Sequence, residues 1–212
     1  MKLTKAEIGW LLLLVVVAGL LTLLLRNRMP LGTDLGENPI VQAVRQDHMS
    51  PATNNPAADV TLIAFTDYRC PACRLTYPEM KRAVAKDGKV RVVYKDWPIF
   101  GAQSEDAARV AIASSFQGIY PKVHDQLMTS PGLDEVALRR AVEDSGGDWN
   151  RLQVDLANRH REIGVQIAQN QTQAFSLALG GTPGFLIGPI LVRGALNEGQ
   201  FSRAIARARE SN

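Results

Sequence analysis

Cysteine and histidine are scarce in this chain. Among its 212 residues there are only two cysteines and three histidines. The histidines, His48, His124 and His160, are widely separated along the sequence. A structural zinc site normally uses four protein ligands, which a lone pair of cysteines cannot supply. The composition therefore argues against zinc.

The globular part of the chain also lacks net charge. Of 24 basic and 21 acidic residues, four basic and one acidic residue flank an apolar N-terminal segment: Lys2, Lys5, Arg26, Arg28 and Glu7. The remaining 20 basic and 20 acidic residues balance, so no basic surface for phosphates is expected. This excludes nucleic acid as a partner.

One long apolar run is present, at the N-terminus. Ile8 to Leu25 contains 18 residues without a charge, which is long enough to cross the core of a bilayer as a helix. Trp10 lies near one end, where interfacial aromatic residues are common. The alternative is a signal peptide cleaved near Ala18, but the apolar run continues beyond that point. We therefore predict that residues 1–28 form a single transmembrane helix that anchors the chain.

Residues 29–58 have the composition of a linker. They are rich in proline, glycine and polar residues and show no sustained period. A short helix around 40–46, with Ile40, Val41 and Val44 on one side, would be a locally packed turn or a lipid-facing or dimerising element. The sequence predicts a tether leading to a globular domain over residues 59–212.

The two cysteines lie three residues apart in Cys70-Pro71-Ala72-Cys73, shortly after the apolar run 60–65. If a helix begins here, Cys70 lies in its first turn, where free N–H groups and the helix dipole stabilise an anion. We therefore expect Cys70 to have a lowered pKa and to act as the nucleophile. Cys73, one turn further, would be the shielded resolving thiol. This arrangement suits dithiol/disulfide exchange.

The cysteine pair has two alternative uses, a copper site and a structural disulfide. Two soft thiolates can hold a monovalent copper ion. A purely structural disulfide is disfavoured, because so small a loop would constrain the unfolded chain little. Redox exchange is the leading interpretation.

The segments around the cysteines predict an α/β fold. The run 60–65 is typical of a buried strand, residues 71–86 of a helix that contains Pro78, and residues 90–94 of a second strand. Strand, helix and strand in this length make a parallel βαβ unit. Helical segments then follow from about residue 103 to 175.

The sheet resumes after a glycine-rich loop that contains Thr182 and Pro183. The runs 185–187 and 190–192 are separated by a Gly-Pro turn and predict a closing hairpin. With glycines on both sides, the Thr182–Pro183 bond can adopt the cis form in a tight loop. A final helix is predicted over residues 198–209.

Several of these features occur together in one family. They are CPAC after a strand, a helix proline eight residues beyond Cys70, a large helical insertion, and the phrases TDYR at 66–69, KDWPIFG at 95–101 and GTPGFLIG at 181–188. From about residue 60 to 209 the chain resembles the thioredoxin superfamily, and more closely the DsbA-type thiol:disulfide interchange proteins. The resemblance implies a thioredoxin-like fold with an inserted helical domain. It also implies that Cys70 forms the mixed disulfide, that Cys73 resolves it, and that a cis Pro183 lines the peptide groove with Thr182.

Two positions depart from the family pattern. Ala64 stands where members commonly have a buried acid, so proton transfer at the second thiol would use water or another group such as Lys95. Ala72 stands where the strongly oxidising members have a histidine. Without that histidine the Cys70 thiolate is less stabilised, which implies a weaker oxidant. Pro71 and Ala72 are therefore expected to tune the motif.

The expected protein is a thiol:disulfide oxidoreductase, anchored in the bacterial inner membrane and facing the periplasm, where oxidised cysteine pairs persist. It would exchange its disulfide with cysteines of unfolded or secreted client proteins, and a membrane redox partner would reoxidise or reduce it. Such exchange needs neither a metal nor an organic cofactor. The alternatives are a disulfide isomerase or reductase of the same compartment, a copper-binding protein, or a client-holding protein without turnover.

Overall fold

The computed structural model describes the backbone of residues 5–28, 31–36 and 38–211, and the side chains of residues 9–20, 31–36 and 38–211. The chain divides into two compact units, Met1–Leu31 and Gly32–Asn212. The first contains helix α1 (Lys5–Arg28), whose described side chains are exposed. Among the described residues, no helix combines the length and hydropathy needed to cross a bilayer. The anchor expected at residues 1–28 stays a prediction.

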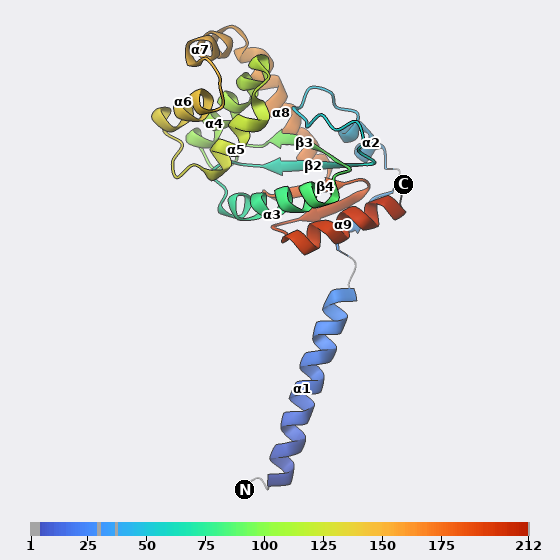
Figure 1. Ribbon diagram of the computed structural model, residues 1–212. Coiled ribbons are helices and arrows are strands. Elements are labelled where there is room, and N and C mark those ends of the chain that lie inside the picture. Colours follow the sequence, from blue (N-terminus) through green and yellow to red (C-terminus); the bar gives the residue numbers. More distant parts are fainter. Residues whose placement is uncertain (1–4, 29–30, 37, 212) are drawn as a thin grey trace. The chain divides into compact units, whose positions relative to one another are not determined.

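The second unit is built on a five-stranded sheet (Figure 1). Its strands are β1 (Thr33–Asp34), β2 (Val60–Thr66), β3 (Val90–Asp96), β4 (Gly184–Ile187) and β5 (Ile190–Arg193). They are ordered β1-β5-β4-β2-β3, with β2 and β3 parallel and the other pairs antiparallel. The predicted βαβ unit and closing hairpin are both confirmed.

Helices cover both faces of this sheet. They are α2 (Pro39–Arg45), α3 (Pro71–Asp87), α8 (His160–Ser176) and α9 (Glu198–Glu210). Helices α3 and α9 pack together on one face, whereas α2 and α8 cover the other. The core on the α2 and α8 side includes Val41, Phe65 and Ala174. Because side chains alternate along a strand, Ala64 points to the opposite face, that of α3.

The helical insertion lies between β3 and β4. Besides α8 it contains α4 (Ala102–Ser114), the 3-10 turn η1 (Ser115–Gln117), α5 (Tyr120–Thr129), α6 (Glu135–Asp144) and α7 (Trp149–Asn158). Figure 1 shows α4 to α7 gathered beyond the carboxyl-terminal ends of β2 and β3. The insertion expected at about residues 103–175 lies here, at the end of the sheet where the CPAC motif starts.

The stretch expected to be a tether is packed against the sheet from Gly32 onward. Strand β1 pairs with β5 at the sheet edge, and α2 buries Val41 and Val44 in the core. Asp47, just beyond α2, forms a buried ion pair with Lys95 of β3. The short helix expected around 40–46 is therefore present as α2 and is packed locally. The rest of the segment differs from the expected linker, because a strand of two residues such as β1 is too short to establish a period in the sequence.

Candidate active site

The CPAC motif lies where β2 ends and α3 begins. Cys70 is the N-cap of α3 and Pro71 is its first residue, a position where the missing N–H would have no partner in any case. The Sγ atom of Cys70 accepts a hydrogen bond from the backbone N–H of Cys73 at 3.3 Å. Both cysteines are buried, and both are free thiols. The predicted helix start at the first cysteine is confirmed.

The two thiols differ in proton affinity. The pKa of Cys70 falls from 9.0 to about 6, chiefly through a hydrogen bond with the Cys73 side chain, which outweighs burial. Thr182 and the backbone of Cys73 and Ala72 lower it further. Burial raises the pKa of Cys73 well above its ordinary value. At neutral pH the first sulfur is therefore largely a thiolate and the second a thiol, as a nucleophile and a resolving group require.

A cis peptide bond joins Thr182 to Pro183 beside the motif, as the sequence predicted. Sγ of Cys70 lies 3.4 Å from the carbonyl oxygen of Thr182, to which the protonated thiol donates. The Thr182 hydroxyl makes no hydrogen bond of normal geometry within the described chain, yet it lies close enough to lower the pKa of both thiols. The structure thus brings Thr182 and Pro183 together with Cys70 and Cys73. Their roles in catalysis and substrate binding remain predictions.

Asp67 organises the loop before the motif, and the sequence reasoning did not single it out. Its buried carboxylate accepts the N–H groups of Arg69 at 2.7 Å, Ile99 at 2.6 Å and Phe100 at 3.1 Å. It also accepts the hydroxyl of Ser104 at 2.6 Å. These bonds join the motif loop to the segment after β3 and to the start of α4. The feature of the sequence that could have identified Asp67 is its position three residues before the first cysteine.

The four tyrosines of the chain all surround one buried histidine, His124 of α5. Their ring centroids lie 4.4 to 5.6 Å from that of His124: Tyr68, Tyr77, Tyr94 and Tyr120. The hydroxyl of Tyr68, two residues before Cys70, lies 2.7 Å from His124 Nδ1. Burial lowers the pKa of His124 to about 3, so its ring is neutral at physiological pH. No local pattern in the sequence marked this histidine as part of the site.

Asp96 completes this buried cluster at the end of β3. Its carboxylate accepts the hydroxyl of Tyr120 at 3.0 and 2.9 Å, and burial raises its pKa to about 7. Ala64, where the family pattern has an acid, pairs with Tyr94 in β3. Asp96 lies two residues beyond Tyr94 and so points to the same face of the sheet. That face therefore has a carboxylate on β3 although it has none at Ala64.

Lys95, suggested from the sequence as a group for proton transfer, forms a buried ion pair instead. Its ammonium group pairs with Asp47, and the two side chains are 0% and 2% exposed. Asp47 also accepts the N–H of Met49 at 2.9 Å and the side chain of Gln173 at 3.2 Å. Lys95 follows Tyr94 in the strand, so it points to the face covered by α2 and α8, away from that of α3. It is therefore not placed to serve the proton transfer suggested from the sequence.

The dithiol has two soft donors for a metal. Among the described residues, no group of three or more histidines, cysteines and carboxylates converges as a metal site. A copper ion held here would rest on the two sulfurs and would have to displace the proton of Cys73, whose pKa is raised by burial.

Comparison with known proteins agrees with this geometry. A family model described as Thioredoxin matches residues 47–207. The crystal structure of a thioredoxin-like oxidoreductase from Silicibacter pomeroyi DSS-3 is 36% identical with a TM-score of 0.74, over 82% of this chain and 98% of that chain. The thiol-disulfide exchange protein alpha-DsbA2 from Wolbachia pipientis has a similar fold, with a TM-score of 0.72 and 24% identity, over 80% of this chain and 96% of that chain.

Curated relatives share only part of their length with this chain. The match to the Na(+)/H(+) antiporter NhaA 3 of Salinispora tropica is 29% identical over 154 residues, which is 71% of this chain. The chain spans about a quarter, 23%, of the length of the curated relatives it matches. Because the family model matches most of the chain and the Silicibacter relative is covered almost completely, the chain belongs to the thioredoxin family and has the fold of its thiol:disulfide oxidoreductases.

Proposed function

We propose that this chain exchanges a Cys70–Cys73 disulfide with cysteines of client proteins. The observation that carries the proposal is the unequal pKa of two thiols at the start of one helix, lowered to about 6 for Cys70 and raised by burial for Cys73. A thiol of low pKa is present as the reactive thiolate and is also the better leaving group from a mixed disulfide.

Oxidation of a client takes two displacements. A client thiolate attacks Sγ of Cys70, which forms a mixed disulfide and releases the sulfur of Cys73, and that sulfur takes up a proton because its pKa is raised. A second client thiolate then attacks the client sulfur, and the Cys70 thiolate leaves. Two electrons pass from the client to the protein, so the client gains a disulfide and the protein ends as the dithiol. The reverse sequence reduces a client, and neither direction needs a metal or an organic cofactor.

We assign substrate binding to Thr182 and Pro183. The Thr182 carbonyl contacts Sγ of Cys70, so a client sulfur bonded to Cys70 comes close to this loop. Pro71 and Ala72 act on the motif, since Pro71 starts the helix and the Ala72 backbone lowers the pKa of Cys70. The methyl side chain of Ala72 adds no hydrogen bond or charge to the thiolate, which favours a moderate reduction potential.

The proposal includes the compartment and the partners that were expected from the sequence. We place the chain in the bacterial inner membrane with its folded domain in the periplasm. The support is the uncharged run of 18 residues from Ile8 to Leu25 and the persistence of disulfides outside the cytosol. The clients would be unfolded or secreted proteins, and a membrane redox partner would restore the active form. Thiol labelling of intact cells with a membrane-impermeant reagent tests the orientation.

The direct test compares two serine variants. Cys70→Ser should abolish exchange, whereas Cys73→Ser should trap a mixed disulfide with the client because no resolving thiol remains. Full exchange activity in Cys70→Ser would exclude this mechanism.

A disulfide isomerase or reductase is the second candidate, and Ala72 is the observation that favours it. The reduction potential of the full chain in glutathione buffers, read by thiol trapping, separates the two. A value near about −120 mV means disulfide donation, and a value of about −200 mV or below means isomerase or reductase.

A further inference from the structure

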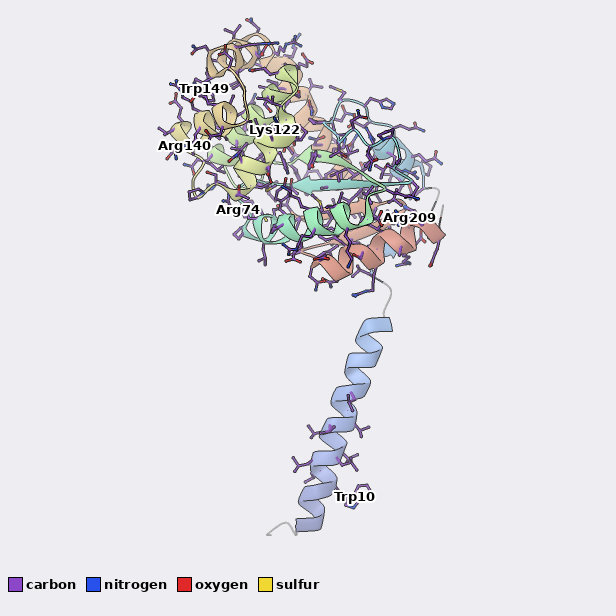
Figure 2. The ribbon with its side chains drawn as sticks, in the orientation of Figure 1. Trp10, Arg74, Lys122, Arg140, Trp149 and Arg209 are labelled. Carbon is purple, nitrogen blue, oxygen red and sulfur yellow. The ribbon has the colours of Figure 1, made fainter. Side chains whose placement is uncertain are left out.

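A groove runs from the CPAC motif onto the helical insertion. One hollow of about 270 Å³ lies beside the motif, with Arg69 and Arg74 in its lining. A second hollow of about 640 Å³ lies between α4, α6 and α7. Gln103 and Leu133 line both, so the two adjoin, and we call them together the insertion groove. Figure 2 shows Arg74 at the end of α3 next to the insertion and Trp149 on the insertion itself.

The end of the insertion groove nearest the dithiol is positive. Arg69 directly precedes the first cysteine, and Arg74 directly follows the second. Their guanidinium groups donate to carbonyl oxygens, from Arg69 to Phe100 and from Arg74 to Tyr68, Leu127 and Ser130. Within the described part of the chain, neither arginine forms an ion pair with a carboxylate. The first hollow is therefore lined by two positive charges without a carboxylate partner.

The second hollow of the groove has an apolar floor. Val110 of α4, Leu133, Leu138 of α6 and Trp149 of α7 contribute to it. These side chains are mostly buried among the helices and present only a small part of their surface to the groove. Such a floor fits an apolar side chain of an extended peptide.

The rim of the second hollow is acidic. Asp106 and Glu135 are exposed there and form no ion pair among the described residues. Asp134 also lies on the rim, where its carboxylate caps α6 by accepting the N–H of Ala137. The one basic residue that lines this hollow, Arg109, pairs with Glu105. The charge of the groove therefore reverses from the first hollow to the second.

We propose that the insertion groove binds an extended segment of the client polypeptide, with an acidic side chain close to the reacting cysteine and apolar and basic side chains further away. This rests on the proposed function, because it concerns the substrate of the same dithiol. A groove whose charge reverses distinguishes the order of charges in a client rather than its net charge. Neither Thr182 nor Pro183 lines it, so it extends recognition beyond the loop at the sulfurs.

The test uses the oxidised full-length protein and two peptides of one composition. Each has a single cysteine, followed in one by glutamates, leucine and lysines and in the other by lysines, leucine and glutamates. Each is also made with the cysteine at the opposite end, because the groove does not specify chain direction. We expect the peptide with glutamates nearest the cysteine to form the acid-quenched mixed disulfide about fivefold faster, the effect of about one exposed ion pair. This ratio should vanish at about 1 M salt. Equal rates, or a faster reversed order, would overturn the proposal.

Variants then locate the effect. Asp106→Asn combined with Glu135→Gln removes two rim charges of the second hollow and should bring the two peptides to within about twofold of each other. Asp144→Asn is the matched control, because Asp144 is exposed on α6 and lies outside the groove. It should keep the full ratio. If the control loses the ratio too, or the double variant keeps it, the discrimination arises elsewhere and the groove proposal fails.

Failure of the groove and failure of the proposed function are separable. The oxidised protein should also oxidise dithiothreitol, a small uncharged dithiol that needs no groove. A protein that leaves dithiothreitol reduced contradicts the proposed function itself. A protein that oxidises dithiothreitol but treats both peptide orders alike contradicts only the groove.

Discussion

The hydroxyl oxygen of Tyr68 lies 2.7 Å from Nδ1 of His124, a residue 56 positions further along the chain. Both side chains are almost completely buried. Tyr68 belongs to the loop before Cys70, and His124 belongs to α5 of the helical insertion. The bond therefore makes the insertion part of the support beneath the cysteines, in addition to its role as one wall of the insertion groove.

Removing the Tyr68 hydroxyl should destabilise the protein. Tyr68→Phe leaves Nδ1 of a buried, neutral histidine with only the Tyr120 hydroxyl, at 3.3 Å, so we expect a loss of about 1–3 kcal/mol in the free energy of unfolding. Urea denaturation measures it. Tyr77→Phe is the matched control, because the Tyr77 ring contacts His124 with the same centroid distance, 5.2 Å, but its hydroxyl is not bonded to the histidine. Equal losses in the two variants would show that this hydrogen bond is unimportant.

The parts of the site that are local in the sequence could be predicted. A helix start at Cys70 follows from the spacing of the cysteines after a strand, and the Thr182–Pro183 loop follows from its glycines. Both were found where expected. Each of these features is determined by residues that lie close together in the sequence. A local sequence pattern is therefore enough to predict it.

The supporting groups could not be predicted in this way. His124 contacts Tyr68, which is 56 residues away in the sequence, and Asp47 contacts Lys95, which is 48 residues away. No sequence pattern near His124 or Asp47 indicates these contacts. Lys95 was misplaced for the same reason. Its side of the sheet is decided by strand alternation, but its partner Asp47 lies just beyond α2, in a segment whose composition predicted a linker with one short helix.

The rate at which Cys70 reacts with an alkylating reagent should depend on pH as expected for a thiol of low pKa. The pKa of this thiol is lowered to about 6, so alkylation of the reduced protein by iodoacetamide should rise with pH through a midpoint near 6. A midpoint above about 8, near that of an ordinary thiol, would contradict the geometry. Because the folded value lies below the ordinary 9.0, this ionisation also stabilises the reduced fold. The gain is complete above pH 9.0 and is lost as pH falls through about 6.

The second cysteine should control this midpoint, because its side chain is the largest cause of the lowered pKa. Cys73→Ala removes the donor and should move the midpoint upward, whereas Cys73→Ser keeps a hydroxyl that can donate to the thiolate and should move it less. Identical midpoints in the two variants would show that a donor at position 73 does not control the pKa of Cys70.

The carboxylate of Asp67 should be needed for stability of the motif loop. Asp67→Asn keeps the shape but replaces one accepting oxygen by an NH₂ group that faces donors, so at least one of the four bonds is lost. We expect a cost of about 3 kcal/mol in urea denaturation. Asp125→Asn is the control, since Asp125 forms a half-exposed pair with Lys81 and should cost less than about 1 kcal/mol. A cost for Asp67→Asn as small as that of the control would mean that the loop is held by other contacts.

The buried pair of Lys95 and Asp47 should show strong coupling. Lys95→Met leaves the Asp47 carboxylate buried without its cation, and we expect a loss of about 3–5 kcal/mol in the free energy of unfolding. The double variant Lys95→Met with Asp47→Leu should lose less than the sum of the single changes, because it leaves no charge unpaired. The exposed pair of Lys81 and Asp125 gives the matched cycle, with coupling below about 1 kcal/mol. If the buried pair coupled as weakly, this ion pair would contribute little to holding residues 38–53 against the sheet, and the burial of Val41 and Val44 would be their main attachment. Strong coupling would mean that a chain shortened to start at residue 59 loses a partner its sheet requires.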